Sequence, residues 1–263
     1  MPPKLSVITP ILNGIRFIGF CLQNVIEQKC PDAEHIIIDG GSIDGTVNII
    51  RKYAEKHSHI RWVSEKDKGQ SDAMNKGIRM ARGEILGFLN ADDYYEPNVL
   101  PRVIEIFTKL SKPSILVGNC NLMDNNGKII EQNLPSKLKI TDLMQGWEIN
   151  QFPVNPSQYF YHKSLHDRIG FFNIDDHFAM DLDFLLRAVQ AANVKYINEF
   201  WGNYRFIHGT KTFEETVNGR SYQRCVNLLN AYKRNLSFSQ KIEIKLKSGF
   251  YRLQRLMKRI SNT

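Results

Sequence analysis

The stretch GFLNADDYY, residues 87–95, begins as an apolar run and ends in two adjacent acids, Asp92 and Asp93, followed by two tyrosines. A short apolar run is typical of a buried strand, and such strands usually end at a glycine or proline turn. Two explanations fit the acids: they keep a surface turn hydrated, or they bind a positively charged group. The pattern on either side of this stretch decides the fold and bears on that choice.

Strands and helices alternate along the residues that precede Asp92. Runs of β-branched and apolar residues predict strands at 4–12, 35–42, 60–65 and 84–90. Apolar residues at helical spacing predict helices at 16–28, 44–57 and 71–82, with Asp44 as the N-cap of the second. This alternation predicts an α/β fold, in which a mostly parallel sheet carries helices on both faces.

Polar residues stand where these strands end, and ligands of such sheets bind beyond the carboxyl ends of the strands. The candidates are Asn13, Asp39, Ser42, Glu65, Asp67 and Asp92. Asp39 can accept hydrogen bonds from the N–H groups of a flat ligand such as a nucleobase. Asp92 can bind Mg²⁺ or Mn²⁺, since these ions prefer one or two carboxylates together with phosphate oxygens.

The second half of the chain is less regular. Its pattern predicts strands at 115–124 and 128–133, a loop at 152–163 that enters another strand, and a helix at 180–192. The helix carries acids in its first turn, where they suit the helix dipole. We find no internal repeat and no low-complexity segment.

Composition indicates a soluble or peripheral protein. The chain has 263 residues, enough for one large domain or two small ones, with 42% hydrophobic and 24% charged residues. Its four cysteines lack C-x-x-C spacing, which favours reduced thiols of a cytoplasmic protein over a zinc site or disulfides. No segment resembles a signal peptide, and no apolar run approaches the ~20 residues that span a bilayer.

The net charge of +8 is concentrated at the C-terminus. Residues 238–263 hold seven lysines and arginines against one acid, so they carry +6 of it. A nearly neutral body argues against nucleic-acid binding. The same segment has apolar residues at helical spacing, namely Leu246, Phe250, Leu253, Met257 and Ile260. Two interpretations stay open: an amphipathic helix that packs on the domain, or one that lies on anionic lipid.

Four segments occur in an order that resembles a known family: SVITPILN, IIIDGGSIDGT, SEKDKGQSDAMNKGIRMARGEILGFLNADD and FFNIDDHFAMDLDFLLRA. Over residues 4–210 the chain resembles a family-2 inverting glycosyltransferase of the GT-A fold. The resemblance implies a GT-A domain at 1–237, with a Rossmann-like nucleotide-sugar-binding half at 1–95 and an acceptor and catalytic half at 96–237. The basic amphipathic helix at 238–263 would follow it.

The resemblance also implies partners and roles. The donor would be a nucleoside-diphosphate sugar held through Mn²⁺ or Mg²⁺, and the acceptor a saccharide or lipid-linked saccharide. Localisation would be cytoplasmic, with peripheral contact on the inner face of the cell membrane as one expectation. Residues expected to bind the nucleotide sugar are Thr9, Pro10, Asn13, Asp39, Ser42, Asp72, Asn90, Ala91, Asp92 and Arg205. Asp92 and His208 are the implied metal ligands, and Asn90 stands where the family has the first acid of its D-x-D motif.

The general base implied by the resemblance is Asp181, with Asp183 as the alternative; Met180 replaces a glutamate that is usual in the family. Inverting transfer needs a base that takes the acceptor's proton and a metal that stabilises the departing diphosphate. Without the resemblance, Asp181 is a helix acid that favours the dipole. Trp147, Trp201, Tyr159 and Tyr161 are either platforms for the acceptor sugar or core residues.

Two other functions were weighed. A sugar-phosphate nucleotidyltransferase would carry a glycine-rich, basic loop after the first strand, and TPILNGIRF, residues 9–17, lacks one. A non-catalytic nucleotide-sugar-binding module would be indicated by loss of Asp92 or Asp181, and both acids are present. The sequence therefore favours an inverting, metal-dependent glycosyltransferase, of the kind that assembles surface polysaccharide or glycolipid.

Overall fold

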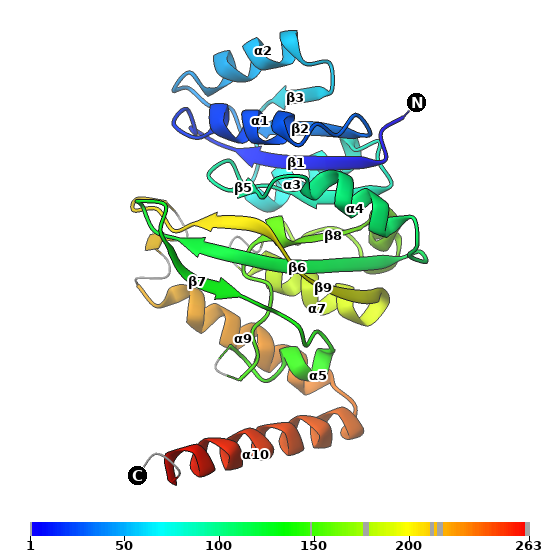
Figure 1. The fold of residues 1–263 in the computed structure, drawn as a ribbon, viewed down its shortest axis with the longest axis vertical. Helices are drawn as coiled ribbons and strands as arrows, with labels where there is room; N and C mark the ends of the chain where they lie inside the picture. The colour runs from blue at the N-terminus through cyan, green and yellow to red at the C-terminus, as the bar shows by residue number, and fades with distance from the viewer. Residues whose placement is uncertain (1, 148, 176–178, 211–212, 215–217, 261–263) are drawn as a thin grey trace.

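A computed structural model describes the chain except residues 1, 148, 176–178, 211–212, 215–217 and 261–263, and the side chains of 253–260. The described residues form one nine-stranded sheet with helices on both faces (Figure 1). Its order is β3-β2-β1-β4-β8-β6-β9-β5, and β7 pairs with β6 outside this path. The α/β fold class predicted from the sequence is confirmed.

The N-terminal half of the sheet is parallel. It consists of β1 (Leu5–Ile11), β2 (Ala33–Asp39), β3 (Ile60–Ser64) and β4 (Ile85–Phe88). The helices between them are α1 (Ile18–Glu27), α2 (Thr46–Lys56) and α3 (Gln70–Met80). The N-cap residue of α2 is Gly45, so the prediction of Asp44 as the N-cap is wrong by one position. Instead Oδ1 of Asp44 accepts a 3.0 Å hydrogen bond from the backbone N–H of Thr46.

The alternation of side chains along β1 explains why both faces of the sheet are covered. Ile8 points into the core cluster that contains Met74 and Ile78 of α3. Ile11 lies in another cluster with Ile18 of α1, on the opposite face. β1 is therefore enclosed between helices on both of its faces, which is the usual environment of a parallel strand.

The C-terminal half of the sheet is mixed. β8 (Tyr159–His162) is antiparallel to both β4 and β6 (Ser114–Met123), and β9 (Asn193–Arg205) runs parallel to β6. Short β5 (Tyr94–Tyr95) and β7 (Ile129–Asn133) pair antiparallel with β9 and β6. The remaining helical segments are α4 (Val99–Phe107), α5 (Ile140–Leu143), η1 (Pro156–Gln158), η2 (Lys163–Leu165), α6 (His166–Ile169), α7 (Met180–Ala191), α9 (Arg220–Asn235) and α10 (Phe238–Ile260).

Three of the four aromatic residues considered as sugar platforms belong to the core. Tyr159, Tyr161 and Trp201 are at most 1% exposed, so the platform interpretation is wrong for them. Trp147 is half-buried and packs edge-on against Phe152, with ring centroids 5.2 Å apart. Packing of these aromatic residues thus joins β8 to its neighbours: Tyr161 stacks on Phe88 of β4, and Trp201 of β9 contacts Phe160.

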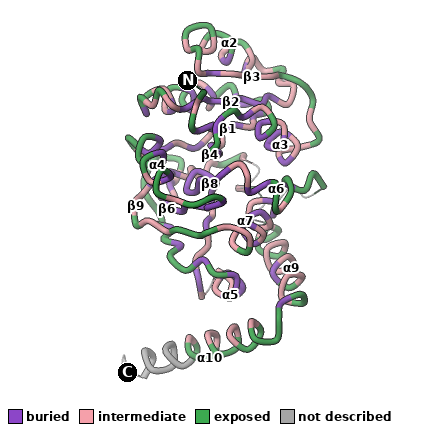
Figure 2. The backbone as a smooth tube through the Cα atoms, turned by 90° about the vertical axis from the view of Figure 1, so that its right-hand side faces the viewer, coloured by how far each residue is buried: buried purple, intermediate pink, exposed green. Residues whose placement is uncertain are grey.

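The C-terminal helix stands apart from the sheet. α9 packs Leu229 into the core, whereas α10 lies at the end of the molecule opposite α2 (Figure 1). Along α10 exposed and half-exposed residues alternate (Figure 2). Among the described residues, no helix combines the length and apolar character needed to cross a bilayer.

Candidate functional site

The carboxyl ends of β1, β2, β4, β6 and β9 lie along one edge of the sheet. β1 and β4 are parallel, β6 and β9 are parallel, and β8 is antiparallel to both β4 and β6. The arrowheads of β1, β6 and β9 accordingly point to the same side (Figure 1). The turn after β4, the end of β2 and the end of β9 can therefore contribute to one site.

The loops after β1 and β2 are tied into a single rim. The backbone N–H of Asn13 donates a 2.7 Å hydrogen bond to Oγ of Ser42, and the N–H of Ile43 donates a 3.0 Å bond to Oδ1 of Asn13. Asn13 has a φ of 49°, a left-handed conformation that asparagine tolerates better than most residues. Two of the predicted residues, Asn13 and Ser42, are thus neighbours in space.

Asp39, the last residue of β2, is fully buried. Its Oδ2 accepts hydrogen bonds from the N–H groups of Gly41 (3.1 Å) and Ser42 (3.0 Å) and from the hydroxyl of Ser64 (2.6 Å). Its Oδ1 is buried without a hydrogen-bond partner among the described residues. Because an unsatisfied buried carboxylate oxygen is unfavourable, a ligand N–H directed at this atom would restore a lost interaction.

Asp67 completes this side of the site. It lies against Gly40, where an added Cβ would come within 2.6 Å of Oδ2 of Asp67 and would displace the Asp67 carboxylate. Oδ1 of Asp67 accepts a 2.9 Å bond from the N–H of Gly69, and Asp72 holds the N–H of Lys68 at 3.0 Å. The sequence predicted Asp67 as an acid at the end of a strand but assigned it no role. Only the structure shows that Asp67 lies against Gly40, beside Asp39.

The two acids of the opening stretch have different environments. Asp93 is fully buried and accepts hydrogen bonds from Asn155 Nδ2 (2.7 Å), Asn90 Nδ2 (3.0 Å) and the N–H of Arg205 (3.0 Å). Asp92 is half-buried, and no other described residue donates a hydrogen bond to its carboxylate. Burial raises the pKa of both acids, and the charge of Asp92 raises that of Asp93 further. Asp93 therefore fixes the turn, while Asp92 offers its carboxylate to a ligand.

Arg205 places a cation beside this turn. Its Nε donates to the carbonyl oxygen of Asp92, and its guanidinium carbon lies over the rings of Phe20 and Phe17, 5.2 and 5.6 Å from their centroids. Its Nη2 is buried without a hydrogen-bond partner among the described residues. A guanidinium held in this way can donate to phosphate oxygens.

The protein groups suit a divalent cation only in part. Among the residues whose placement is described, no three His, Cys, Asp or Glu side chains gather to hold a metal ion. A single carboxylate such as Asp92 is nevertheless the usual protein contribution when Mg²⁺ is bound mainly through a ligand's phosphates. His208 is exposed in the turn after β9, its N–H donates a 3.2 Å bond to Oδ1 of Asn125, and its ring packs on Phe213.

The two candidate bases at the start of α7 also differ. Asp183 uses both oxygens within the fold, accepting from Nε of Arg187 (2.8 Å) and from the hydroxyl of Tyr232 (2.7 Å). Asp181 is half-buried, and its Oδ1 accepts a 3.4 Å bond from the hydroxyl of Tyr159. The two acids thus contact different elements: Asp181 bonds to Tyr159 of β8, whereas Asp183 bonds to Tyr232 of α9.

A chain of contacts connects the start of α7 with the acidic turn. Oγ of Ser71, at the start of α3, lies 2.9 Å from Sδ of Met180. The preceding residue, Gln70, donates a 3.3 Å bond to Oδ1 of Asn90. Met180, which precedes Asp181, and Asn90, two residues before Asp92, therefore both contact the first turn of α3.

Two predicted ligands have side chains that support the fold instead. Thr9 is fully buried, with its hydroxyl 2.8 Å from Nε2 of His35, and Ala91 packs with Ile11 and Ile18 in the core. In the described conformation neither side chain is open to a ligand. Pro10, between Thr9 and the end of β1, is partly exposed.

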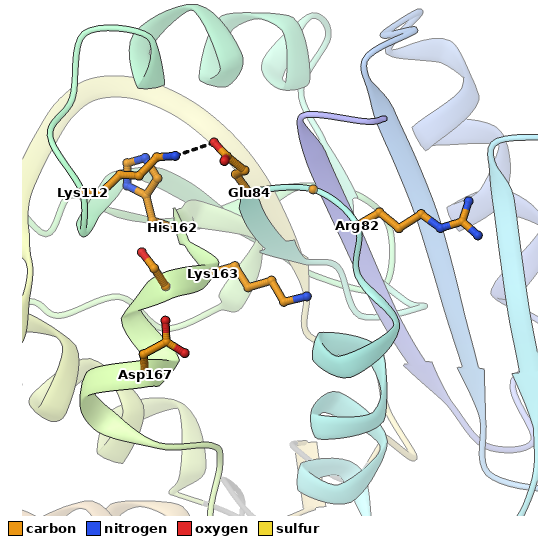
Figure 3. Close-up of a pocket in the computed structure, with 8 residues that line it drawn as sticks. Arg82, Glu84, Lys112, His162, Lys163 and Asp167 are labelled. Atoms are coloured by element: carbon orange, nitrogen blue, oxygen red, sulfur yellow. Dashed lines mark hydrogen bonds and ion pairs between the residues drawn. The ribbon is translucent and has the colours of Figure 1, made fainter. Parts of the chain in front are cut away.

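A cavity on the opposite edge of the sheet is not part of this site (Figure 3). It is lined by residues that precede β4 or β6 or lie at and after the end of β8, among them Arg82, Glu84, Lys112 and Lys163. Its ammonium groups are already engaged, since Lys112 pairs with Glu84 at 2.5 Å and Lys163 donates to the carbonyl of Ala81 at 2.6 Å. Of the charges that line it, Lys112 and Glu84 therefore neutralise each other.

The chain is similar in sequence and in fold to several known proteins. E. coli chondroitin synthase is 30% identical over 215 residues, which cover 80% of this chain and 30% of that protein. The chain thus spans less than a third of the length of this relative. Among solved structures, S. aureus TarS superposes with a TM-score of 0.68 at 17% identity, covering 93% of this chain and 42% of TarS.

Two ligand-bound structures share the fold. TarS 1–349 in complex with UDP-GlcNAc gives a TM-score of 0.62 at 20% identity, covering 77% of this chain and 58% of that one. The Pyrobaculum calidifontis mannosyltransferase PcManGT, in complex with GDP-Man and Mn²⁺, gives 0.56 at 17% identity, covering 98% and 84%. A sequence model described as glycosyl transferase family 2 matches residues 6–170, more than half of the chain. The chain therefore belongs to glycosyl transferase family 2.

Proposed function

We propose that the protein is an inverting, metal-dependent glycosyltransferase that moves a sugar from a nucleoside-diphosphate sugar to an acceptor hydroxyl, in surface-polysaccharide or glycolipid assembly. Family membership supports glycosyl transfer. The observation that carries the donor class is the buried, unpartnered Oδ1 of Asp39 at the carboxyl edge of the sheet. A nucleobase with a ring N–H would satisfy this atom, while the rim of Asn13 and Ser42 would border the nucleoside.

The diphosphate would lie between Asp92 and Arg205. Bound Mg²⁺ or Mn²⁺ would neutralise charge on the departing diphosphate. Asp92 would bind the cation and Nη2 of Arg205 would donate to a phosphate oxygen, with Asn90 alongside. His208 is proposed as a further ligand and would have to approach from the turn after β9. The Mn²⁺ in the PcManGT complex is consistent with this cofactor class.

Asp181 is proposed as the general base. A single displacement at the anomeric carbon needs a carboxylate that takes the acceptor's proton as the hydroxyl attacks, and it needs no covalent nucleophile. Asp181 would accept that proton, whereas both oxygens of Asp183 already accept hydrogen bonds from Arg187 and Tyr232. The acceptor is proposed to be a saccharide or a lipid-linked saccharide.

A donor screen tests this function directly. Release of nucleoside diphosphate is followed with UDP-GlcNAc, other UDP-sugars and GDP-Man in the presence of Mn²⁺ or Mg²⁺, alone and with saccharide acceptors. We expect turnover with one donor class, and weakened donor affinity in Asp39→Asn, whose amide would direct an N–H toward the N–H of the base. Unchanged affinity in Asp39→Asn would contradict the nucleoside site. Donor binding without turnover on any acceptor would instead support a binding module.

A further inference from the structure

The described side chains of α10 that contact the body of the protein lie on one face of the helix. Thr141 of α5 donates a 2.7 Å bond to Oε1 of Glu243, and Lys247 lies 2.5 Å from Oδ1 of Asp142 and 2.6 Å from Oε1 of Glu243. Ile244, on the same side of the helix, packs against the core. We call Thr141, Asp142, Glu243 and Lys247 the α5 latch, because these polar contacts hold α10 in one orientation.

The other face of α10 is an uncovered apolar stripe. Phe238, Ile242, Leu246 and Phe250 follow one another at intervals of four and are 81%, 42%, 69% and 62% exposed. At about 100° per residue they lie on one side of the helix, roughly opposite Ile244. The sequence continues the stripe with Leu253, Met257 and Ile260, whose side chains lie outside the described residues. Soluble proteins rarely leave so continuous an apolar surface without a partner.

Basic residues border this stripe. Lys245 and Arg252 are exposed, and at about 100° per residue they lie within about 40° of Phe238 around the helix axis, beside one edge of the stripe. Residues 238–263 as a whole carry +6, whereas the rest of the chain is nearly neutral. The surface complementary to an apolar stripe edged with cations is an apolar layer that carries anions. A second copy of α10 fits less well, since pairing two stripes would bring like charges together.

We propose that α10 is an interfacial helix that binds the protein to an anionic lipid surface through Phe238, Ile242, Leu246 and Phe250, with Lys245 and Arg252 at the head groups. Such helices lie in the plane of the membrane with the apolar face inserted and the basic residues at the phosphates. The α5 latch fixes the stripe to face away from the body, so insertion requires no unfolding. This surface is separate from the donor site, and the proposal stands independently of the proposed function.

Co-sedimentation with vesicles tests the proposal. The full chain is mixed at low salt with phosphatidylcholine vesicles, with or without phosphatidylglycerol. Two variants probe the surface, Leu246→Ser/Phe250→Ser for the stripe and Lys245→Gln/Arg252→Gln for its edge. The matched control is Arg51→Gln/Lys52→Gln, which removes two exposed cations of α2 at the opposite end of the molecule. Thermal unfolding of each variant verifies that the body remains folded.

We expect binding to the anionic vesicles only, unchanged in the α2 control. Loss of two cations should weaken binding about 30-fold, the change that corresponds to about 1 kcal/mol per cation. The stripe variant should lose binding by at least as much. Absence of binding by the full chain would overturn the proposal, as would binding that survives the stripe variant. A shift from dimer to monomer in the stripe variant, without vesicle binding by the parent, would show that the stripe joins two chains.

Discussion

The backbone N–H of Arg205 donates a 3.0 Å hydrogen bond to Oδ1 of Asp93, although the two residues are 112 positions apart. The bond joins the end of β9 to the turn after β4, and Asn155 reaches the same carboxylate from the loop before η1. The second half of the chain therefore sets the position of Asp92, which directly precedes Asp93. The acidic turn is built by residues from three separate regions.

We predict that Asp93→Asn destabilises the fold. An amide at this position would direct N–H groups toward the N–H groups of Asn155, Asn90 or Arg205, and a buried donor left without an acceptor costs about 1–3 kcal/mol. Urea unfolding measures the change. Asp92→Asn is the matched control, because a half-buried acid without these partners should change stability by less than about 0.5 kcal/mol. Equal stability of the two variants would contradict the structural role of Asp93.

We predict that donor binding depends on a divalent cation through Asp92. Chelation should weaken donor binding to the wild type about tenfold or more, since each 1.4 kcal/mol of lost attraction is a factor of ten. In Asp92→Asn the affinity should be low, and chelation should change it little. Calorimetric titration of the donor identified by the screen, with and without chelator, measures both. Tight binding that is insensitive to chelator and to this substitution would rule out the metal site.

We predict that Asp181 and Asp183 separate into a catalytic and a structural acid. Asp181→Asn should keep donor affinity while turnover falls about 10²–10⁴-fold, the usual loss when a general base is removed. Asp183→Asn should lower stability, because it replaces the acceptor for Arg187 and Tyr232. Turnover, donor affinity and unfolding midpoint are measured for both variants. Near-normal turnover in Asp181→Asn with collapse in Asp183→Asn would reverse the assignment.

We predict that stability falls as the pH drops from 7 to 5, in part because of His35. Burial lowers the pKa of His35 to about 3, so the folded state keeps it neutral while the unfolded state binds a proton below about pH 6.5. Stability therefore rises with pH between these two values. By pH 5 the loss from this residue should be about 2 kcal/mol, at 1.36 kcal/mol per pH unit. Urea unfolding at both pH values should show a smaller loss in His35→Gln; an equal loss would disprove the contribution.

The first half of the fold was predictable because its signals are local. Each strand from β1 to β4 is a short apolar run, and each helix has an apolar face at helical spacing. β9 was not predicted, since its first residues are exposed or half-buried and its place depends on pairing with β6, far away in sequence. In this segment the sequence pointed only to Arg205, the last residue of β9, as a residue with a predicted role.

The sequence indicated which strand ends carry polar residues, but it did not show how neighbouring acids differ in their contacts. Asp92 and Asp93 are chemically identical, and they differ only in partners such as Asn155, which is 62 positions from Asp93. The same holds for Asp181 and Asp183: the hydroxyl that bonds to Asp183 belongs to Tyr232, which is 49 positions away in the sequence. Helical spacing likewise revealed the stripe of α10 but not which side the α5 latch would occupy.

The hydrogen bond from Tyr232 to Asp183 has a mechanical consequence. Tyr232 lies near the end of α9, only Leu236 and Ser237 separate α9 from α10, and Asp183 shares the first turn of α7 with Asp181. Strain imposed on α10 as it settles on lipid would reach α7, the helix that carries the proposed base, through this hydrogen bond as well as through the packing of α9 and α5. The signature would be interfacial activation, in which vesicles accelerate turnover even of a water-soluble acceptor. Tyr232→Phe, which keeps the ring but not the bond, should adsorb normally and lose part of that acceleration.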